Sequence, residues 1–171
     1  MKIVTLGTAN VARSVMLAYM LATLGDAEGR DWRVRSAGTT AVENLALSKA
    51  AWSALERVGE LGEQRYGAHR SHQINGADLA EADVVLAMEA SHVRFLQSWD
   101  ERLGARSVHF AQFVRSAPLD ESLAVQIDVV RALGLDDTLD VLDPANGDQA
   151  NYERCAGELW ELAQAFAVVV L

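Results

Sequence analysis

The opening of the chain constrains its fold more than any other stretch, because it passes from a strand directly into a helix. Residues 3–6 are apolar or β-branched, residues 7–12 are mostly small, and Arg13 and Ser14 open an apolar, helix-forming run. The first N–H groups of a helix have no partner within the helix, and its dipole places about half a positive charge there. This turn is therefore either an anion cradle that Arg13 closes with a planar, bidentate fork, or an ordinary structural turn of an α/β domain.

Strand and helix patterns alternate along the rest of the chain. We expect strands at residues 2–6, 32–36, 83–88 and 107–110. We expect helices at residues 13–24, 47–58, 76–82, 90–103 and 122–133, and a last helix that starts near residue 149. Alternation of this kind predicts an α/β fold with right-handed crossovers and a parallel sheet in a three-layer α/β/α sandwich. Ligands of such sheets bind beyond the carboxyl ends of the strands, where the turn after the first strand would lie.

Apolar spacing within three of these helices predicts which side chains are buried. The inward residues expected in them are Val93, Leu96 and Trp99, then Leu123, Ile127, Val130 and Leu133, and finally Tyr152, Cys155, Leu159, Leu162, Phe166 and Val169. The remainder of residues 111–142 has no clear period and is left without an assignment.

Charge and cysteine content exclude several classes of function. The net charge of −9 argues against nucleic acid or an anionic membrane as a general partner. Cys155 is the only cysteine, which leaves no intramolecular disulfide and no thiolate zinc site, and we expect neither a metal nor another cofactor. At 171 residues the chain is expected to form one domain, residues 1–171. Its opening lacks a signal-peptide pattern, which predicts a cytoplasmic protein, and its oligomeric state is open.

The register from Gly7 to Ser14 resembles the phosphate-binding loop of the low-molecular-weight protein tyrosine phosphatases, which reads Cys-x5-Arg-Ser. Gly7 stands where that family has its nucleophilic cysteine, Ala12 where it has a second cysteine, and Val15 where it has a proline. The resemblance continues, in the family's order, through residues 34–39, 68–74, 82–89 and 142–144. It implies the family's flavodoxin-like fold with a central four-stranded parallel sheet, although residues 111–142 are longer than is usual in the family.

The resemblance also implies roles for individual residues. The phosphate-binding residues would be Gly7, Thr8, Ala9, Asn10, Val11, Ala12, Arg13 and Ser14. Arg13 would also act in catalysis, and Asp143 would be the general acid. The family supports its loop with a left-handed asparagine bonded to the loop serine, to the serine of a Ser-Ala-Gly segment and to a histidine. The matching residues here are Asn10, Ser14, Ser36 and His69.

Replacement of the cysteine changes what this loop can do. Gly7 has no side chain to attack phosphorus, and the hydroxyls of Thr8 and Ser14 need an adjacent base that the loop does not supply. Cys155 lies on the inward seam of the last helix, where packing is its expected role. Without a thiolate, the amides and the guanidinium would face no internal anion, so phosphate or another oxyanion should still bind.

Three hypotheses about function follow. In the first, the chain is a catalytically inactive phosphatase-like protein that binds phosphate or another oxyanion, including one carried by a phosphorylated protein. In the second, it is an active phosphomonoesterase that uses water or a hydroxyl as its nucleophile. In the third, the loop is scaffold only and the chain is an interaction protein. The family's aromatic residues after Asp-Pro are replaced by Ala145 and Asn146, which argues against recognition of a phosphotyrosine ring.

Overall fold

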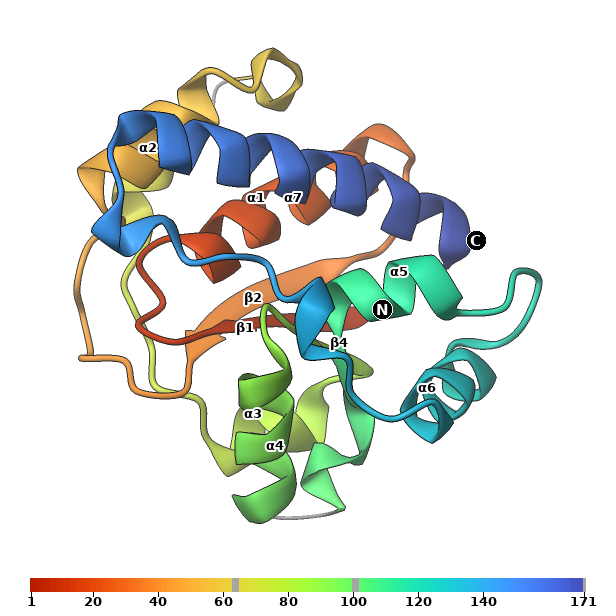
Figure 1. Ribbon diagram of the computed structural model, residues 1–171. Coiled ribbons are helices and arrows are strands. Elements are labelled where there is room, and N and C mark those ends of the chain that lie inside the picture. The colour runs from red at the N-terminus through yellow and green to blue at the C-terminus, as the bar shows by residue number, and fades with distance from the viewer. Residues whose placement is uncertain (63–64, 100–101, 171) are drawn as a thin grey trace.

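A computed structural model of the chain describes residues 1–62, 65–99 and 102–170. Within these residues, a parallel sheet has the strand order β2-β1-β3-β4 (Figure 1). The strands are β1 (Lys2–Gly7), β2 (Arg33–Gly38), β3 (Val84–Ala87) and β4 (Ser107–His109). The four predicted strands and their parallel pairing are confirmed, with shifts of one or two residues at their ends.

Helices cover both faces of the sheet, as the three-layer prediction requires. One face carries α1 (Arg13–Ala27), α2 (Lys49–Glu56), α5 (Phe110–Ser116), α6 (Leu123–Ala132) and α7 (Gln149–Val169). The other carries α3 (Gly76–Glu81) and α4 (Ala90–Trp99) (Figure 1). Short 3-10 helices η1 to η5 cover Gly59–Leu61, Tyr66–Ala68, Leu103–Arg106, Asp137–Leu139 and Pro144–Asn146. None of the described helices is both long enough and apolar enough to span a membrane.

Side-chain oxygens cap several of these helices where their sequences predict a start. Ser48, Ser122 and Asp148 each accept a hydrogen bond from a backbone N–H in the first turn of the helix that follows. His109 does the same with Nδ1, which accepts from Gln112 N at 3.2 Å. This cap is why Phe110 starts α5 instead of extending β4, where the sequence pattern placed it.

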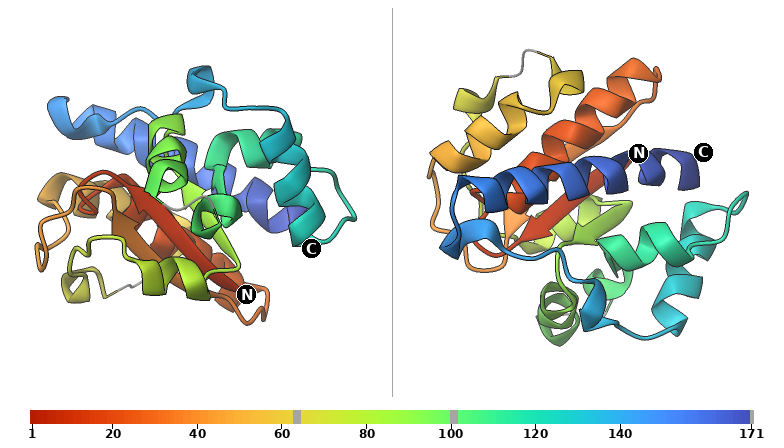
Figure 2. Two further views of the ribbon diagram at one scale, coloured as in Figure 1. Left: turned by 90° about the horizontal axis from the view of Figure 1, so that it is seen from below. Right: turned by 45° about the horizontal axis from the view of Figure 1, so that its top comes forward.

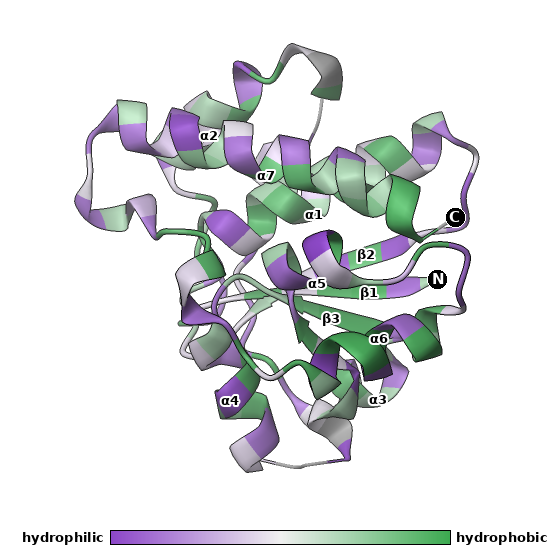
Figure 3. Ribbon diagram, turned by 45° about the vertical axis from the view of Figure 1, so that its right-hand side comes forward, coloured by the Kyte–Doolittle hydropathy of each residue, from purple (hydrophilic) through white to green (hydrophobic). Residues whose placement is uncertain are grey.

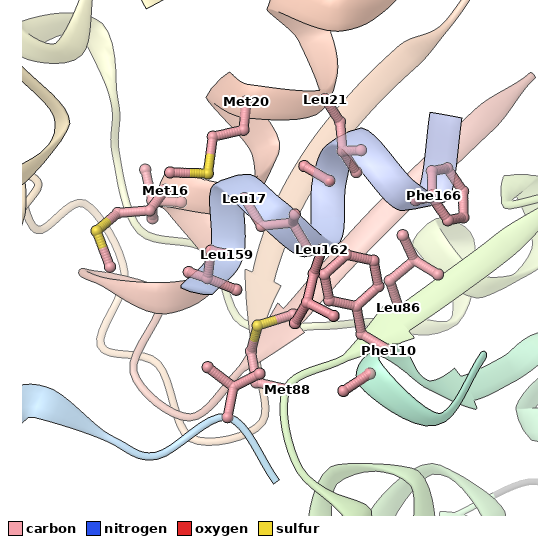
Figure 4. Close-up of a cluster of buried hydrophobic side chains, with 14 of the residues drawn as sticks. Met16, Leu17, Met20, Leu21, Leu86, Met88, Phe110, Leu159, Leu162 and Phe166 are labelled. Atoms are coloured by element: carbon pink, nitrogen blue, oxygen red, sulfur yellow. The ribbon is translucent and has the colours of Figure 1, made fainter. Parts of the chain in front are cut away.

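The larger core lies between the sheet and the layer formed by α1, α5 and α7. Met16, Leu17, Met20 and Leu21 of α1 meet side chains of α7 and β3 there, together with Phe110 (Figure 4). In the right-hand view of Figure 2, α7 lies across α1, and β3 is hydrophobic along its length in Figure 3. The helix α1 is apolar on nearly every side because one side packs on the sheet and α7 covers another.

Two predicted inward residues are exposed instead. Trp99 is 51% exposed at the last turn of α4, and Leu133 is 61% exposed just beyond α6. Both lie where a helix ends, beyond the last residue that the sheet or a neighbouring helix covers, whereas Val93, Leu96, Ile127 and Val130 are buried as expected. The helix predicted at residues 90–103 is described as far as Trp99, and residues 100–101 lie outside the described residues.

Successive strands are added first on one side of β1 and then on the other. From β1 the chain moves to β2 on one side, and from β2 it crosses to β3 on the other side. The carboxyl ends of β1 and β3 are therefore the switch point at which ligands bind in folds of this class. Residues 8–12, which join β1 to α1, lie at this point.

Gly38 lets β2 approach the segment that follows β1. A Cβ at this position would overlap the Thr8 carbonyl oxygen and lie 3.0 Å from Asn10 N and 3.1 Å from Ala41 Cβ. Two of these neighbours are backbone atoms, which cannot rotate away as a flexible side chain could. The close approach of β2 to the segment of residues 8–10 therefore requires glycine at position 38.

We expect Gly38→Ala to lower the free energy of unfolding by about 1–3 kcal/mol, since the new methyl group must push the backbone of residues 8–10 outward. Gly59→Ala is the matched control, because a Cβ at Gly59 has no atom within 4 Å. Urea denaturation of both variants measures the difference. Equal stability of the two variants would show that the backbone of residues 8–10 can move aside without lowering the free energy of unfolding.

Candidate functional site

The loop of residues 7–14 has its carbonyl groups turned outward and hydrogen-bonded. Backbone N–H groups of the segment from Thr39 to Ser48 cap three of them: Thr39 N donates to Gly7 O at 2.9 Å, Thr40 N to Thr8 O at 3.0 Å, and Ser48 N to Val11 O at 2.9 Å. Two more are capped by Met16 N on Ala12 O and by His69 Nε2 on Asn10 O. The segment after β2 therefore holds the loop from its outer side.

The amide groups of the same loop point the opposite way. In a planar trans peptide the C=O of one residue and the N–H of the next point in opposite directions, so outward carbonyls imply inward amides. Across the described part of the chain, none of the N–H groups of residues 8–14 donates a hydrogen bond. By this geometry, the N–H groups that follow the capped carbonyls, those of Thr8, Ala9, Val11, Ala12 and Arg13, face inward. On this side is a cavity of about 70 Å³, which is lined by residues 7–14 together with Asp143, Ala145 and Tyr152. That volume is about twice the share of one water molecule in the liquid, which suits a small anion.

Asn10 fixes the shape of the loop. Its φ of 56° is in the left-handed region that asparagine enters more easily than most residues. Its Nδ2 donates to Ser14 Oγ at 3.1 Å, and its Oδ1 accepts from His72 N at 2.9 Å. His69 Nε2 lies 2.8 Å from Asn10 O. Burial lowers the pKa of His69, which favours the neutral ring with its proton on Nε2, donated to this carbonyl.

Ser36 is not part of this network. It lies in β2 opposite Thr5, two register positions before the carboxyl end, and no hydrogen bond in the described residues joins it to Asn10. The backbone N–H of His72 donates to the side-chain Oδ1 of Asn10 instead. His72 is itself held by Asp78, 2.8 Å from its Nε2, and by Glu43, 3.4 Å from its Nδ1. Burial opposes ionisation of this ring, but the two carboxylates outweigh it and raise the pKa of His72.

Arg13 is buried, with 4% of its surface exposed, and it already binds anions of the protein. Its Nη1 donates to Glu89 Oε1 at 2.5 Å and to Val141 O at 2.7 Å, and its Nη2 donates to Asp143 Oδ2 at 2.7 Å. The expectation that the guanidinium faces no internal anion was therefore wrong. The sheet brings Glu89 to the end of β3, and residues 141–143 cross in front of the loop, so two carboxylates meet one arginine.

The two carboxylates differ in their surroundings. Burial raises the pKa of Glu89, but the hydrogen bond and charge of Arg13 outweigh burial and hold that pKa below its ordinary value. Asp143 is more accessible, with 43% of its side chain exposed. Its Oδ1 accepts from Ala145 N at 3.0 Å and caps η5, which leaves Oδ2 for Arg13. Asp143 thus lines the cavity, whereas Glu89 is the more buried of the two, with 26% of its side chain exposed.

Cys155 offers no reactive thiolate near the loop. It is buried on α7, and burial raises the pKa of its thiol to about 12. A thiol that remains protonated at neutral pH is a poor nucleophile. No three histidine, cysteine, aspartate or glutamate side chains among the described residues gather as a set that could hold a metal ion.

Sequence patterns did not single out Glu89, His92 or Tyr152 as site residues. Tyr152 lines the cavity from α7. His92 is 3% exposed in the first turn of α4, and its Nε2 lies 2.9 Å from Thr8 Oγ1. A usable signal was present for two of them, since Glu89 and His92 follow the carboxyl end of a central strand, the edge where ligands bind in this class of fold.

Comparison with known proteins adds a family context. A family model for low molecular weight phosphotyrosine protein phosphatase matches residues 2–126. A low molecular weight protein tyrosine phosphatase from T. tengcongensis is 28% identical, with a TM-score of 0.78 over 98% of this chain and 97% of that one. A cysteine-to-serine mutant of the YwlE arginine phosphatase, with a phosphorylated active-site serine, is 26% identical, with a TM-score of 0.78 over 98% and 93%. YwlE arginine phosphatase from Geobacillus stearothermophilus is 26% identical, with a TM-score of 0.75 over 97% and 90%. Among curated proteins, none matches the chain.

We expect Asn10→Ala to be less stable than Asn10→Gly by about 1 kcal/mol, although both variants lose the same side-chain hydrogen bonds. Alanine must keep the positive φ with a Cβ, whereas glycine adopts it freely. Chemical denaturation of the two variants measures the difference. An alanine variant as stable as the glycine variant would show that the loop does not need the left-handed conformation.

Proposed function

The chain belongs to the low molecular weight phosphotyrosine protein phosphatase family, and from that premise we propose that it is a pseudophosphatase, a member that binds a phosphate group or similar oxyanion without hydrolysing its ester. The loop of residues 7–14 is the proposed binding site. Its ligand is inorganic phosphate or a phosphate monoester, free or carried by a protein.

The inward amides carry this proposal. The N–H groups of residues 8–14 have no partner among the described residues, and they lie at the start of α1, where the helix dipole also favours negative charge. N–H groups without a protein partner bind water or an anion, so several of them facing one cavity favour an anion there. The outer hydrogen bonds and Asn10 maintain this array without help from a ligand.

The lack of a nucleophile at position 7 supports the part of the proposal that the bound ester is not hydrolysed. A side chain at Gly7 would begin 3.2 Å from Ser14 Oγ, beside the start of α1, and glycine supplies none. A relative with serine in place of its cysteine carries a phosphorylated active-site serine, which supports the importance of that side chain in the family. Cys155, with its buried thiol, is no substitute.

Asp143 would be the competitor that a ligand must displace. It is the more exposed of the two carboxylates on Arg13, and it lines the same cavity as the loop amides. An anion that replaces Asp143 on Nη2 leaves Glu89 on Nη1, so the buried guanidinium stays paired throughout. The cavity needs both residues 7–14 and residues 143–152, and we infer that residues 1–171 act as one domain.

We expect the unmodified chain to show no sustained turnover of p-nitrophenyl phosphate, and Gly7→Cys to hydrolyse it at least ~100-fold faster than Gly7→Ala, because only the cysteine restores a nucleophile. Gly7→Ala is the control for the added Cβ. Steady-state release of p-nitrophenol measures the rates. Sustained turnover by the unmodified chain would contradict the proposal.

We expect Asp143→Asn to bind inorganic phosphate roughly five-fold more tightly than the unmodified chain, since the ion pair of the partly exposed Asp143 with Arg13, which phosphate must displace, is worth about 1 kcal/mol. Asp137→Asn removes the same charge from an exposed pair with Arg94 outside the cavity and controls for net charge. Isothermal titration calorimetry measures both affinities. Equal gains in the two variants would mean that Asp143 does not compete with the ligand.

A further inference from the structure

Thr8, which lines the loop cavity, forms a hydroxyl–imidazole pair with His92, a buried residue of α4. Thr8 is exposed and lines the cavity, and its Oγ1 lies 2.9 Å from Nε2 of His92. This separation is within the range that joins a nucleophile to its general base. The sequence pattern indicated that no base accompanies the hydroxyls of the loop. None lies in the loop itself, but the first turn of α4 brings one to Thr8.

His92 is available as a base at neutral pH. Burial lowers the pKa of His92, and the charged groups that face the ring are Glu89, Arg13, Asp140 and Asp143. The three carboxylates oppose the effect of burial, and Arg13 adds to it. The ring is thus neutral above its ordinary pKa of 6.5 and can accept a proton on Nε2 when Nδ1 carries the hydrogen.

The other nitrogen of this ring is unusual. His92 Nδ1 is buried and has no hydrogen-bond partner in the described residues. A buried polar atom without a partner lowers stability, and a chemical role of the group is one reason for such an atom to persist. Ser14 carries the other hydroxyl group of the loop and differs from Thr8. Ser14 is 1% exposed, and its Oγ accepts a hydrogen bond from Asn10 Nδ2.

We propose that Thr8 accepts the phosphoryl group of a bound aryl phosphate and retains it as phosphothreonine. This inference rests on the proposed anion site. Thr8 Oγ1 attacks phosphorus, so a new O–P bond forms while the P–O bond to the aryl group breaks. The proton of the Thr8 hydroxyl passes to His92 Nε2, and the aryloxide leaves and takes a proton from water. The products are phosphothreonine and a phenol, with no redox change.

Retention follows from the chemistry of the product. Phosphothreonine is an alkyl phosphate ester, whose alkoxide is a far poorer leaving group than a thiolate, and hydrolysis would need a second activated nucleophile opposite Thr8. The imidazole of His92 lies beside Thr8 Oγ1, so it is not placed to activate a water that attacks phosphorus from the opposite side. The chain therefore transfers one phosphoryl group and then stops, which is consistent with an inactive member of its family.

The test is incubation of the full chain with p-nitrophenyl phosphate, followed by intact-mass measurement and peptide mapping. We expect one equivalent of p-nitrophenol and one phosphoryl group per chain, on Thr8. Thr8→Val keeps the shape without the hydroxyl and should gain none. His92→Gln keeps a hydrogen-bonding side chain without a base and should react about 100-fold more slowly. The rate should fall in the unmodified chain only as the pH drops through the lowered pKa of His92, and this dependence should vanish in His92→Gln.

Binding of inorganic phosphate, followed by calorimetry, separates this inference from the proposed function and shows that each variant is folded. If phosphate binds but no phosphoryl group is transferred, the inference is overturned and the binding function stands. Transfer that survives in Thr8→Val, or release of p-nitrophenol well beyond one equivalent, also overturns it. If phosphate does not bind to the unmodified chain, the proposed function fails and the inference fails with it.

Discussion

The buried guanidinium of Arg13 is the point on which the rest of the site depends. It joins the first residue of α1 to Glu89 at the end of β3 and to Val141 and Asp143 in the segment before α7. A charge removed from water requires partners, because leaving it unpaired costs several kcal/mol. The segment from Val141 to Asp143 is therefore held across the loop by electrostatics, although no regular secondary structure connects it to the sheet.

Support of the loop is separate from the chemistry that such a loop performs elsewhere in its family. Asn10, His69 and the backbone of His72 set its shape, and the segment after β2 caps its carbonyls. None of these contacts needs a side chain at position 7. The shape of the loop is consequently independent of the residue at position 7, as the proposed binding function requires.

Much of the architecture was predictable because it depends on local periodicity. Continuous apolar content identified β3 as a central strand, and the three- and four-residue spacing of Tyr152 to Val169 identified α7. Predictions failed where distant contacts decide. Phe110 starts a helix that His109 caps, Trp99 is exposed at the end of α4, and Asn10 Oδ1 binds a backbone N–H of His72 rather than Ser36.

The sequence by itself determined the order of strands and helices, the family, and the small, cysteine-free turn with Arg13 at its end, since these depend on residues close together in the chain. Tertiary structure decided which charges meet. Arg13 and Asp143 are 130 positions apart, and Thr8 and His92 are 84 apart. Parallel strands end at one edge, so side chains that are distant in sequence converge there, and only the folded chain shows that the arginine already holds two carboxylates and that an imidazole lies beside a hydroxyl.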